Sequence, residues 1–358
     1  MSKMNKQILI TGGAGFVGSA LAIGLAQRYP DCKITALDNL KRRGSELNLP
    51  RLKQAGIQFI HGDIRNQEDL DTIALQPDLI LECSAEPSVL AGYTSPGYVL
   101  QTNLVGTINC LELARQTQAD FIFLSTSRVY PIAYLNALDF TETETRFQLL
   151  EQQHLIGASN HGISEEFPLD KARSLYGSTK LASELLITEY ADAYGIRTLI
   201  NRCGVLTGPW QMGKVDQGVF ALWMAFHYFQ KPLKYIGYGG TGKQVRDFLH
   251  IADLLDLIDI QICSLEDLKG QTFNVGGGVN NTLSLSETTQ LCEEITGNQI
   301  PITPIPENRI GDVPIFITDS RKVMNATGWQ PQRDAKTTLT EIYEWICQFE
   351  SQVSDIFN

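Results

Sequence analysis

Short apolar runs alternate with longer amphipathic stretches through the first half of the chain, and this alternation predicts strands and helices in turn. Six runs are expected to be strands: Gln7–Thr11, Lys33–Asp38, Ile57–His61, Leu79–Cys83, Phe121–Ser125 and Thr198–Arg202. Between them lie helical patterns such as Asn103–Gln116, where apolar residues recur three and four positions apart. Nearly continuous apolar strands separated by helices are typical of a parallel sheet that is covered on both faces. The pattern therefore predicts an α/β fold with a doubly wound parallel sheet.

The composition and the hydrophobic pattern of the sequence change after about residue 205. Glycine, proline and aromatic residues become frequent, as in Gly208–Trp210 and Tyr235–Gly242, and strand signals become short and irregular. A length of 358 residues also fits two domains better than one. We expect residues 1–205 to form the first domain, with returning segments at about 251–277, and residues 206–358 to form a smaller α+β lobe.

The charge balance narrows the class of partner. The chain has 29 basic and 40 acidic residues, which gives a formal net charge of −11. An acidic surface repels phosphate backbones and anionic lipids, so we expect neither nucleic acid nor a membrane as partner. The longest apolar run, Val219–Phe226, is far shorter than the roughly 20 residues of a bilayer span. The N-terminal residues lead directly into the first strand, so we expect no signal peptide.

The cysteines and histidines indicate neither a disulfide framework nor a metal site. Seven cysteines are dispersed without a CxxC pair, at positions 32, 83, 110, 203, 263, 292 and 347. Such a set is typical of reduced core thiols in a cytoplasmic protein. The five histidines are equally scattered, so we expect no metal.

Three glycines follow the first strand and open a helical pattern, in the segment Gly12-Gly-Ala-Gly15-Phe-Val-Gly18. Gly12 permits a tight turn, Gly15 lets the backbone approach a pyrophosphate, and Gly18 allows the helix to pack closely on the strand. The start of that helix supplies N–H donors and a positive dipole end for phosphate groups. This context predicts a Rossmann-type dinucleotide site.

A carboxylate at the end of the second strand indicates which dinucleotide binds. Asp38 can accept hydrogen bonds from the adenosine ribose hydroxyls and repels a 2′-phosphate, which favours NAD over NADP. Lys41, Arg42 and Arg43 follow directly and could instead hold such a phosphate, although a solvated basic turn is the simpler interpretation. Asp63-Ile64, after the third strand, stands where such folds contact adenine; a capping role for the aspartate stays open.

Tyr176-Gly-Ser-Thr-Lys180 begins a long helical pattern and carries the candidate catalytic pair. The four-residue spacing puts the phenol and the ammonium on one helix face, where the cation favours the tyrosinate. A tyrosinate is a competent base for a sugar hydroxyl. The fifth strand ends in Ser125-Thr126-Ser127, so Thr126 or Ser127 can supply a hydroxyl that bridges the substrate oxygen and the tyrosine.

These motifs, in this order, resemble the extended short-chain dehydrogenase/reductase family, which includes the NDP-sugar epimerases and dehydratases. The likeness extends from about Lys6 to Pro331 and includes the segment Asn103–Thr107. The resemblance implies that Thr126 rather than Ser127 is the catalytic hydroxyl, because it lies four residues before Tyr130. It also implies NAD contacts beyond the glycines and the catalytic pair, at Phe16, Val17, Asp38, Asn39, Asp63, Ile64, Ser84, Ala85 and Asn103.

Within this family, the residues point toward epimerases. Dehydratases carry an Asp-Glu pair directly after the catalytic hydroxyl, whereas this chain has Ser127 and Arg128, so dehydration lacks its acid/base pair. Four segments are similar to CDP-paratose 2-epimerases: His61–Asn66, Thr141–Arg146, Asp216–Gly218 and Gly242–His250. Two departures, an inserted-looking loop at about 149–172 and Val205 in place of the usual asparagine, leave the sugar open.

A nucleotide diphosphate brings negative charge into an acidic protein, so local arginines are required. The resemblance implies pyrophosphate contacts at Arg246 and Arg309, for which a surface salt bridge is the alternative, while Asp216 and Gln217 are candidate hydroxyl or base contacts. The expected reaction is epimerisation through a transient ketone, with C2 of CDP-paratose as the best match.

The alternatives left open are a UDP-hexose or UDP-uronate 4-epimerase, a reductase that releases NAD(H), and a non-catalytic NAD-sensing protein. The resemblance also implies a homo-oligomer, a dimer or tetramer, assembled through helices such as Asn103–Gln116 and Ser178–Tyr194.

Overall fold

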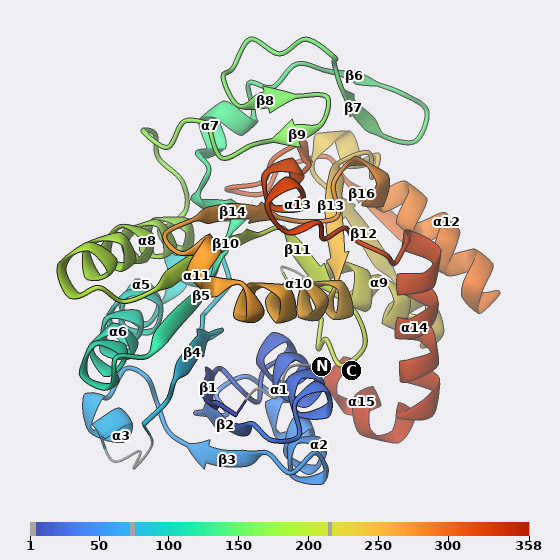
Figure 1. Cartoon of the computed structure of the whole chain (residues 1–358). Helices are drawn as coiled ribbons and strands as arrows, with labels where there is room; N and C mark the ends of the chain where they lie inside the picture. Colours follow the sequence, from blue (N-terminus) through green and yellow to red (C-terminus); the bar gives the residue numbers. More distant parts are fainter. Residues whose placement is uncertain (1–4, 72–75, 214–216, 358) are drawn as a thin grey trace. The chain divides into compact units, whose positions relative to one another are not determined.

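The computed structural model describes residues 5–71, 76–213 and 217–357 (Figure 1). The chain divides into two compact units. The first unit comprises Met1–Thr126, Leu175–Arg202 and Leu254–Thr272, and the second comprises Ser127–Ser174, Cys203–Asp253 and Phe273–Asn358.

The first unit is built on the predicted parallel sheet. Its strands are β1 (Gln7–Thr11), β2 (Lys33–Asp38), β3 (Gln58–His61), β4 (Leu79–Glu82), β5 (Asp120–Thr126) and β10 (Thr198–Cys203). With β14 (Thr272–Val275), which begins where the unit ends, the order is β14-β10-β5-β4-β1-β2-β3. The pairings of β1 with β2 and β4, of β2 with β3, and of β4 with β5 are parallel. All six predicted strands are present, with ends shifted by a residue at most.

Helices cover both faces of this sheet, as a doubly wound fold requires (Figure 1). On one face, α1 (Phe16–Arg28) packs against α10 (Ile251–Cys263), and Arg28 forms ion pairs with Asp256 and Asp259. On the other face, α6 (Gly106–Thr117) packs against α8 (Leu175–Tyr194). The shorter helices are α2 (Leu49–Gln54), α3 (Gln67–Asp71), α4 (Ala91–Thr94), α5 (Pro96–Leu100), α11 (Leu265–Leu268) and the turns η1 (Ser45–Asn48) and η2 (Gln101–Val105).

The second unit is α+β, as expected, and its sheets are smaller than that of the first unit. The unit itself spans 185 residues against 173 for the first, so it is not the smaller lobe that the sequence predicted. β13 (Val245–His250) pairs with β11 (Val205–Thr207), β15 (Thr282–Ser284) and β17 (Ile315–Phe316). β12 (Leu233–Ile236) pairs with β16 (Ile302–Ile305), and two hairpins join β6 (Phe140–Glu142) to β7 (Phe147–Leu149) and β8 (Ala158–Ser159) to β9 (Gly162–Ile163). Its helices are α7 (Ile132–Leu135), α9 (Val219–Tyr228), α12 (Leu285–Thr296), α13 (Arg321–Thr327), α14 (Ala335–Gln348) and α15 (Glu350–Phe357), with the turns η3 (Ser127–Val129), η4 (Tyr238–Gly240) and η5 (Val279–Asn281).

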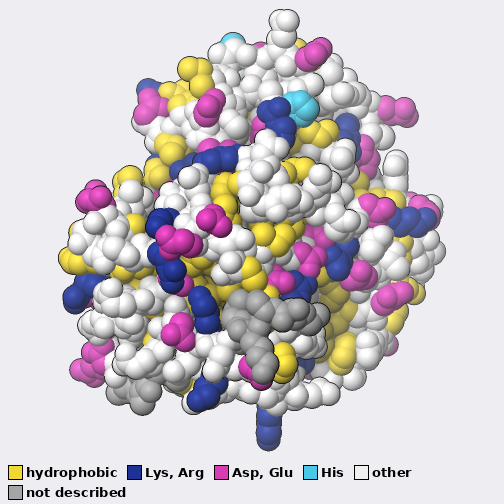
Figure 2. Space-filling view, viewed as in Figure 1, with side chains coloured by type: hydrophobic (Ala, Val, Ile, Leu, Met, Phe, Trp, Pro, Cys, Tyr) yellow, Lys and Arg dark blue, Asp and Glu magenta, His cyan; other side chains and the backbone are white. Residues whose placement is uncertain are grey.

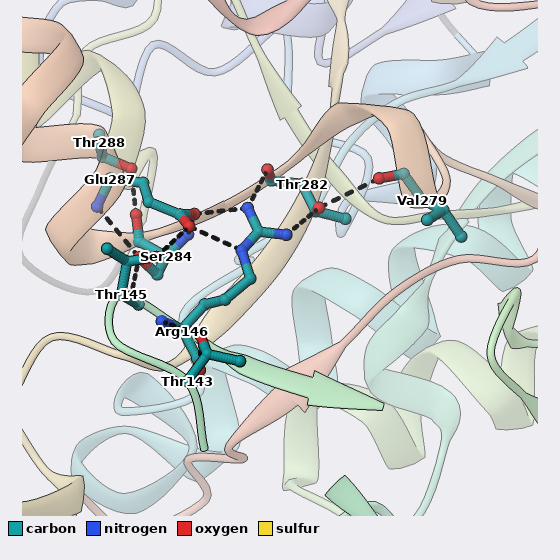
Figure 3. A network of polar contacts seen from close by, with 8 residues as sticks. All are labelled: Thr143, Thr145, Arg146, Val279, Thr282, Ser284, Glu287 and Thr288. Carbon is teal, nitrogen blue, oxygen red and sulfur yellow. Dashed lines mark hydrogen bonds and ion pairs between the residues drawn. The ribbon is translucent and has the colours of Figure 1, made fainter. Parts of the chain in front are cut away.

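The segment Ser127–Ser174 lies in the second unit, whereas the sequence-based division kept it in the first domain. Arg146 explains the difference, because its guanidinium extends from the β6–β7 hairpin to α12 and β15 (Figure 3). It donates to Glu287 Oε1 at 2.7 Å and Oε2 at 2.5 Å, and to the Thr282 hydroxyl at 2.9 Å and carbonyl at 3.0 Å. These partners lie more than a hundred residues away, so no local pattern indicates them.

The prediction of core thiols is wrong for Cys263 and Cys347, which are exposed. Each follows a buried isoleucine, Ile262 of α10 or Ile346 of α14, so the cysteine itself lies on the outer face of its helix. Cys110, Cys203 and Cys292 are buried as expected.

Residues 5–71, 76–213 and 217–357 contain no candidate membrane-spanning helix and no candidate metal cluster. No helix there is long and apolar enough to cross a membrane. No group of three or more His, Cys, Asp or Glu side chains there could hold a metal ion. On the face drawn in Figure 2, acidic and basic side chains are interspersed.

Candidate active site

The glycines of the loop in the first unit stand where a side chain would collide with neighbouring protein atoms. Gly12 has φ +63°, and a Cβ there would lie 3.0 Å from the backbone of Cys83 and Ser84. A Cβ on Gly18 would lie 2.2 Å from the Gly12 carbonyl oxygen, so this glycine packs the helix on the loop itself. Gly13, to which the sequence analysis gave no role, packs on β2, because a Cβ there would lie 2.6 Å from Ala36 Cβ.

The start of α1 is open to an anion. Gly15 is the N-cap residue and provides no side-chain hydrogen bond, and the first turn contains no acidic residue. The N-terminal N–H groups of this helix are therefore not capped by a side chain, and they carry the positive end of the helix dipole. A helix start without a side-chain cap or an acidic residue fits the pyrophosphate of a dinucleotide.

Asp38 ends β2 beside this loop, as the spacing predicted. Its Oδ2 accepts a hydrogen bond from the Ala14 N–H at 3.1 Å, and its Oδ1 accepts one from the Leu40 N–H at 2.8 Å. Burial raises the pKa of this carboxyl, and the backbone hydrogen bonds partly offset the increase. The backbone bonds fix the direction in which the carboxylate points and leave each oxygen with further acceptor capacity.

Asn39, Asp63 and Ile64 adjoin the same edge of the sheet. Arg65 Nη2 donates to Asp63 Oδ2 at 2.6 Å and Asn39 Nδ2 donates to it at 2.9 Å. Burial alone would raise the pKa of Asp63, but these hydrogen bonds outweigh it and lower the pKa to about 2. Ile64 is buried, and its side chain packs against Gly106 of α6. Contact of Asp63 and Ile64 with adenine stays a prediction.

Asn103 connects the segment after β4 to the catalytic helix. It is fully buried in η2; its Oδ1 accepts from the Glu86 N–H at 2.7 Å, and its Nδ2 donates to the Glu86 carbonyl at 3.0 Å and to the Thr179 hydroxyl at 3.4 Å. The nearby predicted cofactor residues, Ser84 and Ala85, are half-buried. Asn103 therefore fixes this segment, and its direct contact with NAD stays a prediction.

The three predicted catalytic residues all belong to the first unit. Thr126 is the last residue of β5, and Tyr176 and Lys180 lie in the first turns of α8. They are 7%, 8% and 1% exposed. The end of β5 and the start of α8 thus hold an alcohol, a phenol and an ammonium in the same unit as the glycine loop. These are the groups needed to move a proton to or from a sugar hydroxyl.

A buried ion pair beside this group was not predicted from the sequence. Glu184, one turn beyond Lys180, accepts hydrogen bonds from Arg202 Nη2 at 2.7 Å and from the Ser125 hydroxyl at 2.5 Å. Both charged side chains are less than a tenth exposed. The pair connects β10, α8 and the residue before Thr126, and so fixes the strand tip against the helix. The four-residue spacing of Tyr176, Lys180 and Glu184 was the available sequence signal.

The second unit gathers the predicted phosphate-binding arginines around one loop. Arg246, on β13, donates to Asp312 Oδ1 at 2.7 Å and to the Val313 carbonyl at 2.6 Å. The Arg309 carbonyl accepts from the Asp312 N–H at 3.2 Å, so both arginines adjoin Asp312.

Arg128, which stands where dehydratases have an acid, joins the same loop. Its Nη1 donates to the Gly311 carbonyl at 3.1 Å. Burial raises the pKa of the neighbouring Tyr238 to about 12; Asp312 adds to the increase, and Arg246 and Arg128 oppose it. Of the other predicted substrate residues, Gln217 is half-buried just before α9, and Asp216 lies outside the described residues.

Comparison with known proteins identifies the family. The model of the NAD dependent epimerase/dehydratase family matches residues 8–276, which is most of the chain. The chain belongs to this family. The family resemblance inferred from the glycine loop, Asp38 and the Tyr176/Lys180 pair is thereby confirmed, as is the Rossmann architecture.

Individual members of the family cover nearly the whole chain. A CDP-paratose 2-epimerase of Salmonella typhi is 32% identical over 351 residues, which are 95% of this chain and 98% of that protein. The crystal structure of the UDP-glucose 4-epimerase of Thermotoga maritima with UDP-glucose is 25% identical, with a TM-score of 0.75 over 96% of this chain and 99% of that one. The Bacillus cereus UDP-glucuronic acid 4-epimerase, solved with UDP-glucuronic acid and NAD, shares the fold with a TM-score of 0.77 and 24% identity, over 96% of this chain and 99% of that one.

Proposed function

We propose that this protein is an NAD-dependent nucleotide-sugar epimerase that inverts C2 of CDP-paratose to give CDP-tyvelose. The observation that carries the proposal is the placement of Thr126, Tyr176 and Lys180 in one unit with a glycine loop at the uncapped start of α1. The similarity to a CDP-paratose 2-epimerase over 98% of that protein supports the choice of sugar nucleotide.

NAD, when bound, supplies the acceptor and donor of the hydride. Tyr176 removes the proton of the reacting sugar hydroxyl, and Thr126 holds the sugar oxygen by a hydrogen bond. Lys180 stabilises the tyrosinate and binds the nicotinamide ribose. The resulting sugar ketone rotates in the pocket, so that the opposite face of its carbonyl is reduced while Tyr176 returns the proton.

The second unit supplies cations for the diphosphate of the substrate. Arg246 and Arg309 bind its oxygens through paired N–H donors, with Arg246 released from Asp312. Arg246→Ala should raise KM at least about tenfold, the loss of one charged hydrogen bond, with little change in kcat. Arg321→Ala is the control, because this arginine of the same unit is largely exposed and pairs with Asp319. An unchanged KM for Arg246→Ala would remove Arg246 from the substrate site.

A second candidate is a UDP-hexose or UDP-uronate 4-epimerase. It is favoured by the similarity to the Thermotoga maritima epimerase that was solved with UDP-glucose. Arg128, which replaces the dehydratase acid, fits either epimerase. Incubation with a panel of CDP- and UDP-sugars, followed by NMR of the sugar, separates the two proposals.

The decisive test of the chemistry uses Tyr176→Phe. This variant should bind NAD as the wild type does, yet lose turnover by a factor of about 10² or more. Tyr194→Phe is the matched control, since Tyr194 lies on the same helix and is 48% exposed. If wild-type protein binds NAD and epimerises no sugar nucleotide of the panel, a non-catalytic NAD-sensing function is supported instead. A stoichiometric change in NADH absorbance would indicate a reductase that releases NAD(H).

We also propose a homo-oligomer that assembles through the outer faces of α6 and α8. Leu185 of α8 supports this, because it is an apolar side chain that is 65% exposed. Sedimentation should give a dimer or tetramer, and Leu185→Glu should shift it toward monomer.

A further inference from the structure

Lys180 has a buried carboxylate partner that the proposed chemistry does not use. Glu82, the last residue of β4, is fully buried, and its Oε2 lies 3.7 Å from Lys180 Nζ. Lys180 is itself only 1% exposed. Removing two opposite charges from water is costly, so such a pair in the interior calls for an explanation beyond surface electrostatics.

Strand register places this carboxylate. Glu82 is paired with Phe123 of β5 and with Thr11 of β1 in the parallel sheet. Lys180 Nζ lies 3.8 Å from the centre of the Phe123 ring, and Glu82 Oε1 accepts a hydrogen bond from the Ser84 N–H at 3.1 Å. The ammonium thus meets an aromatic face and a carboxylate from neighbouring strands, both of which favour its charged form.

The other groups around Glu82 and Lys180 are neutral or already paired with each other, so these two charges balance each other. Burial raises the pKa of Cys110, on α6, well above its usual range, so this residue stays a neutral thiol at physiological pH. Thr11 of β1 and Asn103 of η2 are neutral. On α8, Glu184 is paired with Arg202, which leaves Tyr176 as the remaining titratable group on the helix face of Lys180.

Burial also raises the pKa of Glu82, while Lys180, Ser84 and Thr11 oppose the increase. The carboxylate therefore depends on the ammonium for its charge. The converse follows from the same geometry: a lysine that is 1% exposed keeps its proton more easily beside a carboxylate than without one.

We propose that Glu82 is a positioning residue, the counter-ion that keeps Lys180 charged and in place so that Lys180 can stabilise the Tyr176 phenolate. This inference rests on the catalytic pair of the proposed function and adds a third member to it.

Glu82→Gln tests the charge alone, because glutamine has the same shape and can still accept the Ser84 N–H bond. Without its counter-ion, buried Lys180 should lose its proton more readily and stabilise the phenolate less. The titration midpoint of Tyr176, followed by NMR of isotope-labelled tyrosine in NAD-loaded protein, should rise by about one pH unit. The acidic limb of kcat/KM should move in the same direction. Tyr176→Phe identifies the Tyr176 signal.

Glu82→Asp separates this role from a structural one. It keeps the charge but leaves space in the core, so it should lower stability while its Tyr176 midpoint stays closer to wild type than that of Glu82→Gln. Glu68→Gln, which removes an exposed carboxylate from α3, should leave the midpoint unchanged.

A Tyr176 midpoint in Glu82→Gln that equals or falls below that of the wild type would overturn the inference. The same holds if Glu82→Asp shifts it as much as Glu82→Gln. The NMR titration requires no turnover, so it decides the role of Glu82 even if no sugar nucleotide is epimerised, an outcome that would contradict the proposed function alone.

Discussion

Gly18→Ala perturbs the dinucleotide loop without touching any predicted ligand donor. An alanine Cβ at this position would lie 2.2 Å from the Gly12 carbonyl oxygen and 2.8 Å from Gly13 Cα. All the obstructing atoms are backbone, and Gly18 has no positive φ, so lack of space is the whole difficulty. Ordinary contact begins at 3.4 Å, so the loop must move by about 1 Å.

The structure sets the size of the effect. Forcing an extra methyl group into a packed site costs about 1–3 kcal/mol of stability. The same movement displaces the turn that the Gly15 N–H to Gly12 carbonyl bond of 3.0 Å holds, and with it the donors at the start of α1. Losing one hydrogen bond to a charged phosphate costs about 1.5–3 kcal/mol, so NAD affinity should fall about ten- to a hundredfold.

Isothermal titration with NAD measures this fall at a temperature where the variant is folded, and denaturant unfolding measures the stability. Gly97→Ala is the matched control, since a Cβ on this glycine of α5 would meet nothing within 4 Å. It should leave NAD affinity unchanged and stabilise the protein by at most about 1 kcal/mol. Wild-type affinity and stability in Gly18→Ala would refute the steric reasoning.

Three further predictions concern buried charges. Arg202→Met should lower the free energy of unfolding by about 3–5 kcal/mol, because Glu184 is left unpaired, and adding Glu184→Gln should restore part of the loss; additive losses would contradict the pairing. Burial raises the pKa of Asp247 from 3.8 to about 6 against several opposing hydrogen bonds. The folded state therefore holds this proton more tightly than the unfolded chain, and wild-type stability should fall relative to Asp247→Asn as pH rises from about 4 to 6. If the free energy of unfolding changed equally with pH in both proteins, the raised pKa of Asp247 would be contradicted. Asp38→Ser should raise the NADP-to-NAD affinity ratio about tenfold, by removing the charge that repels a 2′-phosphate; an unchanged ratio would place that phosphate elsewhere.

Local sequence patterns predicted most of the strands and helices of the first unit. The strand ending at Asp38 and the helix that begins after Gly15 are governed by neighbours in sequence, through apolar periodicity and the conformational freedom of glycine. The helix that carries Tyr176 and Lys180 was predicted for the same reason, and the catalytic role of the two residues stays a prediction.

Contacts between side chains that are far apart in the sequence could not be predicted from such local patterns. Glu82 received no role from the sequence, and only the register of β4 with β5 places it by Lys180. Arg146 was noted only as the end of the segment Thr141–Arg146, yet it bonds Glu287 across the second unit (Figure 3).

The sequence by itself therefore predicted the alternation of strands and helices, the dinucleotide loop, the four-residue spacing of Tyr176 and Lys180, and the family, because each of these signals lies in short stretches of the chain. The tertiary structure alone decided which charges are buried and what faces them: Glu82 with Lys180, Glu184 with Arg202, and Arg246 with Asp312. The physical reason is that desolvation and pairing depend on distance in space, and a linear pattern does not encode that distance between remote residues.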